Sequence, residues 1–386
     1  MTRPGHPSGP EPVDIAGVGI HPFGRFEDRT ITDLGVHAVR QALDDAALGR
    51  TDLQATFCGT AYGGVASGHK VLGRLAMTGM PIVDVEAGCA SGAAALMLGA
   101  ASVRSGQYDS VLVLGIEKMP KGIIRSSFFD SWQEAAGLSA TPAYFALRAQ
   151  RLMADSGVTD YDLASVVVKN RRNGTANPDA MFRSEVTAEA VLSSRMVCPP
   201  LHLLMLCSPN EGAAAVVLRR RDPMAGSVRL RAVTLVSHLP GPVLSESTPM
   251  SGLCDDSIPA PTARAAQLAY EEAGVGPADL DVVECQDTDA ARELTSCEEL
   301  GLCAAGECAG LVRDGITAMG GRIPVNPSGG LLSKGEPLGA SALGQVVELV
   351  HQLRGDAAGR QVDGAQVGLA HTIGRGANAS VVIVGR

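Results

Sequence analysis

The sequence predicts an α/β protein built around a buried sheet. Continuous apolar runs of strand length alternate with segments of helical periodicity, which is the pattern of such a protein. The same order of elements also occurs twice along the 386 residues, which indicates an internal duplication. We therefore expect two similar halves, residues 13–225 and 226–386, after a flexible tail over 1–12. A buried helix in each half, one starting at Cys89 and one near Pro337, is expected to meet the other back to back.

The first half contains its elements in a regular order until residue 118. An amphipathic helix over 31–47 is predicted by Leu34, Ala38 and Leu43, which share one face at helical spacing. The remaining predicted elements are strands at 13–20, 55–59, 81–88, 110–118 and 212–218 and a helix of small residues over 89–103.

Residues 118–205 break this alternation with clusters of Pro, Asn, Arg and Met. We predict a loop domain here, with short helices over 141–156 and 162–170, that covers the active site.

The second half repeats the plan. Gly274 stands where the stop signal of a helix over 261–273 is expected. A glycine-rich turn over 326–340 leads into a helix that ends near Leu353. The other predicted elements are strands at 228–236, 281–285, 367–371 and 379–384 and a helix over 290–300.

Composition limits the function. The net charge of −9 argues against a broad nucleic-acid surface, and no apolar run reaches the roughly 18 residues that span a membrane. The first 12 residues lack the apolar core of a signal peptide. Nine cysteines without a CxxC pair give weak support for a zinc site or a disulfide framework, so we expect no metal and a reducing, cytoplasmic setting.

Cys89 stands between a strand-like run ending at Gly88 and the helix of small residues that follows. A sharp turn there places the sulfur at a helix N-terminus, where free N–H groups and the helix dipole favour the thiolate. A thiolate in that place can accept an acyl group. Cysteine is also a common small core residue, so the window alone leaves both interpretations open.

Four ordered segments then identify a resemblance. They are GCASGAAA (88–95), SPNEGAAAVVL (208–218), NPSGGLLSKGEPLGASALGQ (326–345) and HTIGRGANAS (371–380). From about Val13 to the C-terminus the chain resembles the thiolase superfamily, and within it the sterol-carrier-protein-2-type thiolases. The resemblance implies two βαβαβαββ halves in five layers, α/β/α/β/α, with an inserted loop domain.

The resemblance also implies a homodimer that uses acyl-CoA thioesters as substrates and holds no tightly bound cofactor. Cys89 matches the acyl-accepting cysteine of the family. Its N–H and that of Gly374 match the pair that forms one oxyanion hole, where each donor is worth about 3–4 kcal/mol.

Two departures from the family bear on the chemistry. The glycine turn carries Gly-His-Pro in the family and reads Gly335-Glu336-Pro337 here. The histidine of that turn polarises a thioester carbonyl, whereas Glu336 as an anion would repel a thiolate or an enolate. Either burial raises the pKa of Glu336 and makes it a general acid or base, or the site has lost Claisen chemistry.

The second departure lies at 286–289, where the family has His-Asp-Cys-Phe and this chain has Gln286, Asp287, Thr288 and Asp289. Gln286 can still donate a hydrogen bond, but Thr288 cannot replace a thiol acid/base at neutral pH. His371, just before the predicted oxyanion glycine, is a candidate replacement base or a residue that only hydrogen-bonds the loop. Cys285 is expected to point to the opposite face from Gln286.

Basic residues at 169–172 and at Arg183 form a patch on an otherwise acidic chain. Arg171, Arg172 and Arg183 are candidates to hold the phosphates of coenzyme A, or else belong to a solvated loop. From the resemblance, Ser328 and Gly329 of the glycine-rich turn are also expected to line the coenzyme A site.

These observations support an acyltransferase of lipid or secondary metabolism in which Cys89 takes the acyl group. The second step is expected to be non-standard, with Glu336, Gln286 and His371 as its candidate residues. A retro-aldolase acting on a β-hydroxyacyl-CoA is an alternative. Another is a non-catalytic subunit, because similar thiolase-like proteins assemble with a small OB-fold partner that bears a zinc ribbon.

Overall fold

The computed structural model describes residues 12–122, 131–137, 140–221, 228–239, 259–374 and 378–386. The tail predicted over 1–12 lies outside these residues except for Pro12. The predicted boundary between residues 225 and 226 also lies outside them.

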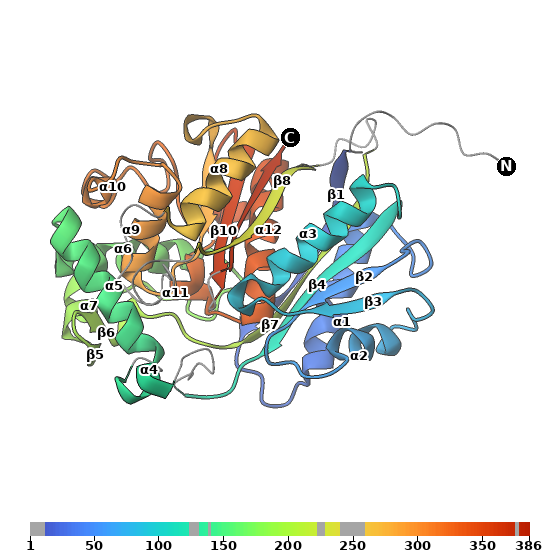
Figure 1. The fold of residues 1–386 in the computed structure, drawn as a ribbon, viewed down its shortest axis with the longest axis horizontal. Helices are drawn as coiled ribbons and strands as arrows, with labels where there is room; N and C mark the ends of the chain where they lie inside the picture. The colour runs from blue at the N-terminus through green and yellow to red at the C-terminus, as the bar shows by residue number, and fades with distance from the viewer. Residues whose placement is uncertain (1–11, 123–130, 138–139, 222–227, 240–258, 375–377) are drawn as a thin grey trace.

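One mixed sheet runs through the molecule in the order β3-β2-β4-β7-β1-β8-β11-β10-β9 (Figure 1). Its strands are β1 (Val13–Gly24), β2 (Thr56–Gly59), β3 (Ile82–Val85), β4 (Ser110–Lys118), β7 (Glu211–Arg220), β8 (Val228–Ser237), β9 (Val282–Cys285), β10 (Val367–Gly374) and β11 (Asn378–Gly385). The two halves join where Val13–Ile15 of β1 pairs with Val228–Leu230 of β8.

The pairing pattern is the same in both halves when each is followed inward from its outer edge. In the first half β2 is parallel to β4, β4 is antiparallel to β7, and β7 is antiparallel to β1. In the second half β9, β10, β11 and β8 repeat these relations. Val325 even forms a parallel bridge with Val283 of β9, as β3 does with β2. The predicted duplication is therefore confirmed.

Helices lie in three layers around the two parts of the sheet. Helices α1 (Ile31–Ala46) and α2 (Ser67–Arg74) cover one outer face, and α8 (Pro261–Ala273) and α9 (Ala290–Glu299) cover the other. Helices α3 (Ser91–Arg104) and α12 (Leu338–Arg354) lie between the two parts, where both halves contribute to one apolar core. This is the expected five-layer arrangement.

The central helices α3 and α12 pack closely, as predicted for the two buried helices. A Cβ placed on Gly92 of α3 would lie 2.8 Å from the carbonyl oxygen of Gly339 in α12. A Cβ on Gly115 of β4 would lie 2.4 Å from the same oxygen. The small residues of these segments therefore let the two halves come into backbone contact.

The segment predicted as a loop domain packs on the second half. Its elements are α4 (Ser131–Ala135), α5 (Thr141–Ser156), α6 (Asp160–Thr175), α7 (Ala188–Ser193), β5 (Met196–Cys198) and β6 (Leu201–His202). Apart from α4, these elements share an apolar cluster with α9, α10 (Cys308–Arg313) and α11 (Gly330–Lys334), and Figure 1 shows α5–α7 gathered beside α9 and α10. Helix α6 is longer than the predicted 162–170.

Local signals explain several helix ends. The side chain of Thr30 caps α1 through Asp33, and Thr159 caps α6 in the same way through Asp162. Helix α8 ends at Gly274 with φ 65°, as its stop signal predicted. Within the described residues, no helix combines the length and apolarity needed to cross a membrane.

Candidate active site

Cys89 lies in a single 3-10 turn, Gly88–Ala90, between β3 and α3. Gly88 has φ 58°, and Ser91 fixes the turn because its hydroxyl donates to the carbonyl of Gly88 at 2.6 Å and accepts from the N–H of Ala87 at 2.9 Å. Cys89 is buried at the start of the 14-residue helix α3. The structure therefore places this thiol at a helix N-terminus, as the sequence predicts.

Gly374, at the end of β10, lies directly against this turn. A Cβ on Gly374 would be 2.2 Å from the carbonyl oxygen of Ala87 and 3.2 Å from the nitrogen of Ala90. Only glycine allows this approach, and it brings the backbone of Gly374 beside that of Cys89. The two N–H groups expected to form an oxyanion hole thus belong to neighbouring segments.

Glu336 is 6% exposed and follows Gly335, whose φ is 82°. Its N–H donates to the carbonyl of Ser208 at 2.8 Å, which holds it beside the segment that leads into β7. Its carboxylate receives Nε2 of Gln286 on Oε1 at 2.8 Å and the thiol of Cys207 on Oε2 at 3.3 Å. Two donors therefore fix the position of this buried carboxylate.

Cys207 is a site residue that the sequence did not single out. Besides its contact with Glu336, it interacts electrostatically with Cys89. Burial and the Glu336 carboxylate raise the pKa of the Cys207 thiol well above its ordinary value. The only available signal was its position directly before the SPNEG segment, so a three-dimensional arrangement was needed to find it.

Gln286 connects Glu336 to the strand that carries Gly374. Its Oε1 accepts from the N–H of Ile373 at 2.7 Å while its Nε2 donates to Glu336. Cys285 lies in the apolar cluster beneath α8, so the expected separation of Cys285 from Gln286 is observed. The hydroxyl of Thr288 donates to Asp289 at 3.2 Å.

His371 is not part of this cluster, which corrects the expectation that it acts as a base there. It pairs with Cys285 in the sheet register and its side chain faces α8, where Nε2 lies 3.0 Å from Oγ1 of Thr262. Burial and the nearby Arg292 lower the pKa of His371 well below its ordinary value. The sheet therefore separates its imidazole from Cys89.

Ser328 and Gly329 are also placed differently from the expectation that they line a coenzyme A site. Both are buried. The hydroxyl of Ser328 donates to Glu284 at 2.6 Å, and a Cβ on Gly329 would be 2.7 Å from Gly174. They hold the glycine-rich turn inside the protein.

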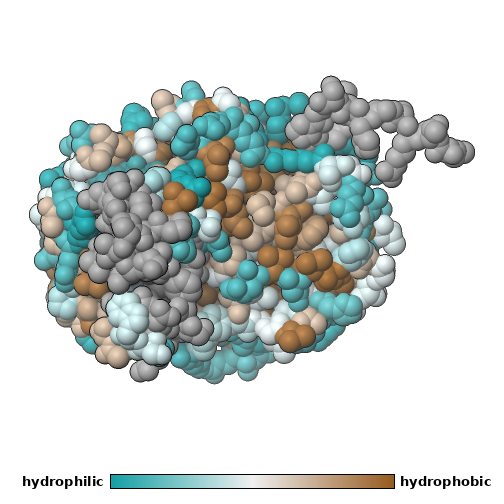
Figure 2. All heavy atoms as spheres, in the orientation of Figure 1, coloured by the Kyte–Doolittle hydropathy of each residue, from teal (hydrophilic) through white to brown (hydrophobic). Residues whose placement is uncertain are grey.

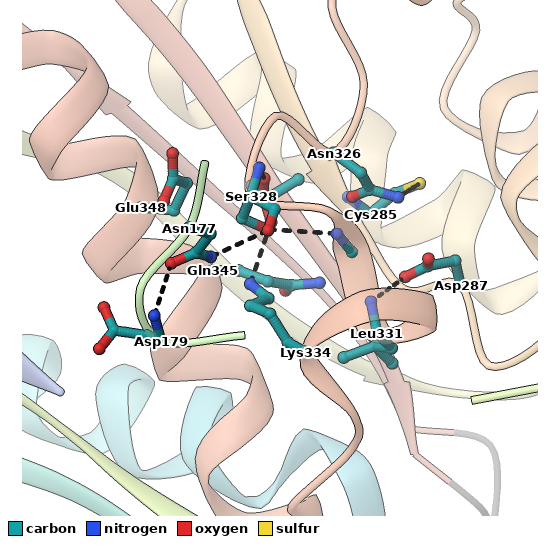
Figure 3. Close-up of polar contacts among 12 residues, drawn as sticks. Asn177, Asp179, Cys285, Asp287, Asn326, Ser328, Leu331, Lys334, Gln345 and Glu348 are labelled. Atoms are coloured by element: carbon teal, nitrogen blue, oxygen red, sulfur yellow. Dashed lines mark hydrogen bonds and ion pairs between the residues drawn. The ribbon is translucent and has the colours of Figure 1, made fainter. Parts of the chain in front are cut away.

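Figure 3 shows the polar network around this turn, in which Asn177 reaches the carbonyl of Ser328 and Asp287 accepts from the N–H of Leu331 at the start of α11. The same network includes the buried Lys334, whose Nζ lies 3.3 Å from Glu284. These contacts set the position of α11, and therefore of Glu336 just beyond it.

The predicted basic patch is divided between the interior and the surface. Arg171 is 7% exposed, and its guanidinium lies 4.2 Å from the ring centre of Phe182. Lys169 is engaged with Glu293 at 2.7 Å. Arg172 and Arg183 are exposed.

Among the described residues, no group of His, Cys, Asp and Glu side chains is arranged to hold a metal ion. No disulfide joins any of the eight cysteines in the described part of the chain. Cys254 lies outside that part.

Family models match both halves of the chain. Residues 13–197 match the model described as thiolase, N-terminal domain, and residues 246–386 match the one described as thiolase C-terminal domain-like.

Individual relatives agree with this result. The chain is 36% identical to an acetyl-CoA acetyltransferase of Methanothermobacter thermautotrophicus, over 97% of this chain and 99% of that protein. It is 34% identical to sterol carrier protein 2 of Bos taurus, over 96% of this chain and 72% of that protein. A solved structure described as the Ltp2-ChsH2(DUF35) aldolase matches with a TM-score of 0.86 and 25% identity, over 97% and 98% of the two chains. The chain belongs to the thiolase superfamily.

Proposed function

We propose that this thiolase-superfamily enzyme takes an acyl group from an acyl-CoA thioester onto Cys89. The observation that carries the proposal is the series of contacts that joins Glu336 through Gln286 to the end of β10, where Gly374 lies against the turn of Cys89. The helix N-terminus favours the attacking thiolate. In this proposal the N–H groups of Cys89 and Gly374 receive the charge that develops on the thioester oxygen.

Glu336 acts in this proposal as the general base. Gln286 and Cys207 hold its carboxylate in position, and in this proposal it accepts a proton from Cys89 or from an acceptor substrate. It cannot polarise a carbonyl as a neutral histidine would. The second step is therefore a transfer with chemistry other than ordinary thiolysis.

The exposed Arg172 and Arg183 hold the phosphates of coenzyme A in this proposal. The buried Arg171 stacks on Phe182, the residue before Arg183, and so helps to position this surface. No tightly bound cofactor is needed for these steps.

A retro-aldol cleavage of a β-hydroxyacyl-CoA is the second candidate, and the similarity to the Ltp2-ChsH2(DUF35) aldolase favours it. Glu336 would abstract the hydroxyl proton. The carbon–carbon bond would then break, and its electron pair would remain on the carbon next to the thioester carbonyl. That relative also supports an OB-fold partner for this chain.

We also infer a homodimer in a cytoplasmic setting, for which free cysteines are suited. Figure 2 shows hydrophobic atoms gathered over α3 and β3, where Leu98 is 37% and Val83 43% exposed. Because β3 is also an edge strand, a second copy of the chain is the occupant that we assign to this face.

The test is the intact mass of the protein after incubation with a series of acyl-CoA thioesters, beside a Cys89→Ala control. A gain of one acyl group that the control lacks is expected. If no donor gives an adduct, acyl transfer is excluded. Cleavage of β-hydroxyacyl-CoA would then identify the retro-aldolase, and inactivity even with a co-expressed OB-fold partner would identify the non-catalytic subunit.

A further inference from the structure

The thiol of Cys207 is directed at Glu336 by the backbone on both sides. The N–H of Cys207 donates to the carbonyl of Thr288 at 2.9 Å. The carbonyl of the next residue, Ser208, accepts from the N–H of Glu336 at 2.8 Å. These bonds fix the cysteine between the 286–289 segment and the glycine turn, with Sγ 3.3 Å from Oε2 of Glu336.

Cys207 and Cys89 differ in their surroundings although they interact. Cys89 stands at the N-terminus of α3, where a helix dipole stabilises negative charge. Cys207 faces a carboxylate, and that neighbour together with burial holds its proton in place. The two thiols are therefore suited to opposite tasks, attack by one and proton donation by the other.

We propose that Cys207 is the proton donor to the leaving coenzyme A and that Glu336 returns a proton to it. The inference deepens the proposed function and rests on it. Glu336 takes the proton of Cys89 as the sulfur of Cys89 forms a bond to the acyl carbon. The carbon–sulfur bond to coenzyme A then breaks, and its electron pair leaves on the coenzyme A sulfur.

Cys207 donates its proton to that sulfur, so coenzyme A departs as the thiol. The carboxylic acid of Glu336 then passes its proton across the 3.3 Å contact to the thiolate of Cys207. Both residues end as they began, and acyl-Cys89 and free coenzyme A are the products. A contact between the two groups is necessary for this return step, and the structure provides it.

The experiment compares two classes of acyl donor. A coenzyme A thioester needs a proton for its leaving group, whereas an aryl thioester of the same acyl group leaves as a weakly basic thiolate that needs none. We expect Cys207→Ala to slow acylation of Cys89 by acyl-CoA by about 10²-fold or more, and by the aryl thioester only slightly. Single-turnover release of each thiol, followed by chromatography, measures both rates.

Cys207→Ser keeps the size of the side chain. It tests for the same slowing of acylation by acyl-CoA if alanine disturbs folding. Cys198→Ser, in β5 of the same segment, is the matched control and is expected to match the wild type with both donors. Equal slowing of both donors by the Cys207 variants, or no slowing, would overturn the proton-donor assignment. If the wild type itself is not acylated, it is the proposed function that fails.

Discussion

Gln286 and Glu336 lie 50 residues apart in the chain, and the amide of the first donates to the carboxylate of the second at 2.8 Å. The same amide accepts from the backbone of β10 one residue before Gly374. A change in the orientation of Glu336 is therefore transmitted to the strand end beside Cys89. This contact makes the carboxylate, rather than a histidine, the central polar group of the site.

Replacing Glu336 by Gln tests this role directly. The amide has the same shape but cannot accept a proton, so acylation of Cys89 should slow by about 10²- to 10⁴-fold. Single-turnover acylation followed by intact mass measures the rate. The unfolding free energy should change little, because the glutamine oxygen can still accept from Gln286. A variant that acylates at the wild-type rate would remove Glu336 from the mechanism.

The buried pair of Lys334 and Glu284 allows a test of stability near the site. Their charged atoms lie 3.3 Å apart, burial raises the pKa of Glu284, and Lys334 opposes that rise. Lys334→Met leaves the carboxylate without its cation, so denaturant unfolding should show a loss of about 3–5 kcal/mol.

The double variant Lys334→Met with Glu284→Gln is the matched control for that loss. It removes both charges and should recover most of the stability, because the cost arises mainly from the unpaired charge. Equal loss in the single and double variants would show that packing, not charge, is responsible.

The sequence predicts the fold well because its signals are local. The apolar runs, the glycine after α8 and the small residues of α3 each act within one turn or strand. The duplicated order of elements then determines which strands meet. Glu336 and Gln286 are singled out differently, because each stands where the family motif that the chain resembles has another residue.

The parts that sequence reasoning missed depend on contacts between distant segments. Cys207 and Glu336 are 129 residues apart, and no periodicity relates them. His371 was misplaced for a different reason. It is in register with Cys285, so the alternation that directs Cys285 toward α8 also directs the imidazole there.

Gly92 is expected to be intolerant of a side chain. A Cβ there would lie 2.8 Å from the backbone oxygen of Gly339, and backbone cannot rotate away as a side chain can. Gly92→Ala should therefore destabilise the protein by about 1–3 kcal/mol in denaturant unfolding. Gly73→Ala in α2 is the control, because a Cβ there meets nothing within 4 Å. A Gly92 variant as stable as this control would contradict the close packing of α3 and α12.

The exposed Arg172 provides a test of the coenzyme A site. Its removal in Arg172→Ala should raise KM for acyl-CoA about fivefold, since an exposed charge contact is worth about 1 kcal/mol. The value of kcat should stay the same. The difference in KM between this variant and the wild type should become smaller at high salt. Arg40→Ala, an exposed arginine of α1, is the control. Equal KM values for both variants would place the phosphates elsewhere.

The burial of His371 predicts that the unfolding free energy of the protein decreases in acid. Its pKa in the folded protein is well below its ordinary value because of burial and Arg292, so the unfolded chain binds its proton first as the pH falls. Stability that is fully present above about pH 6.5 should then fall by up to about 1.4 kcal/mol per pH unit below it. In His371→Gln this part of the slope should disappear, while His69→Gln, at an exposed position, should keep it. Denaturant unfolding between pH 8 and pH 5 measures the slopes, and identical slopes in the two variants would show that His371 is not the group responsible.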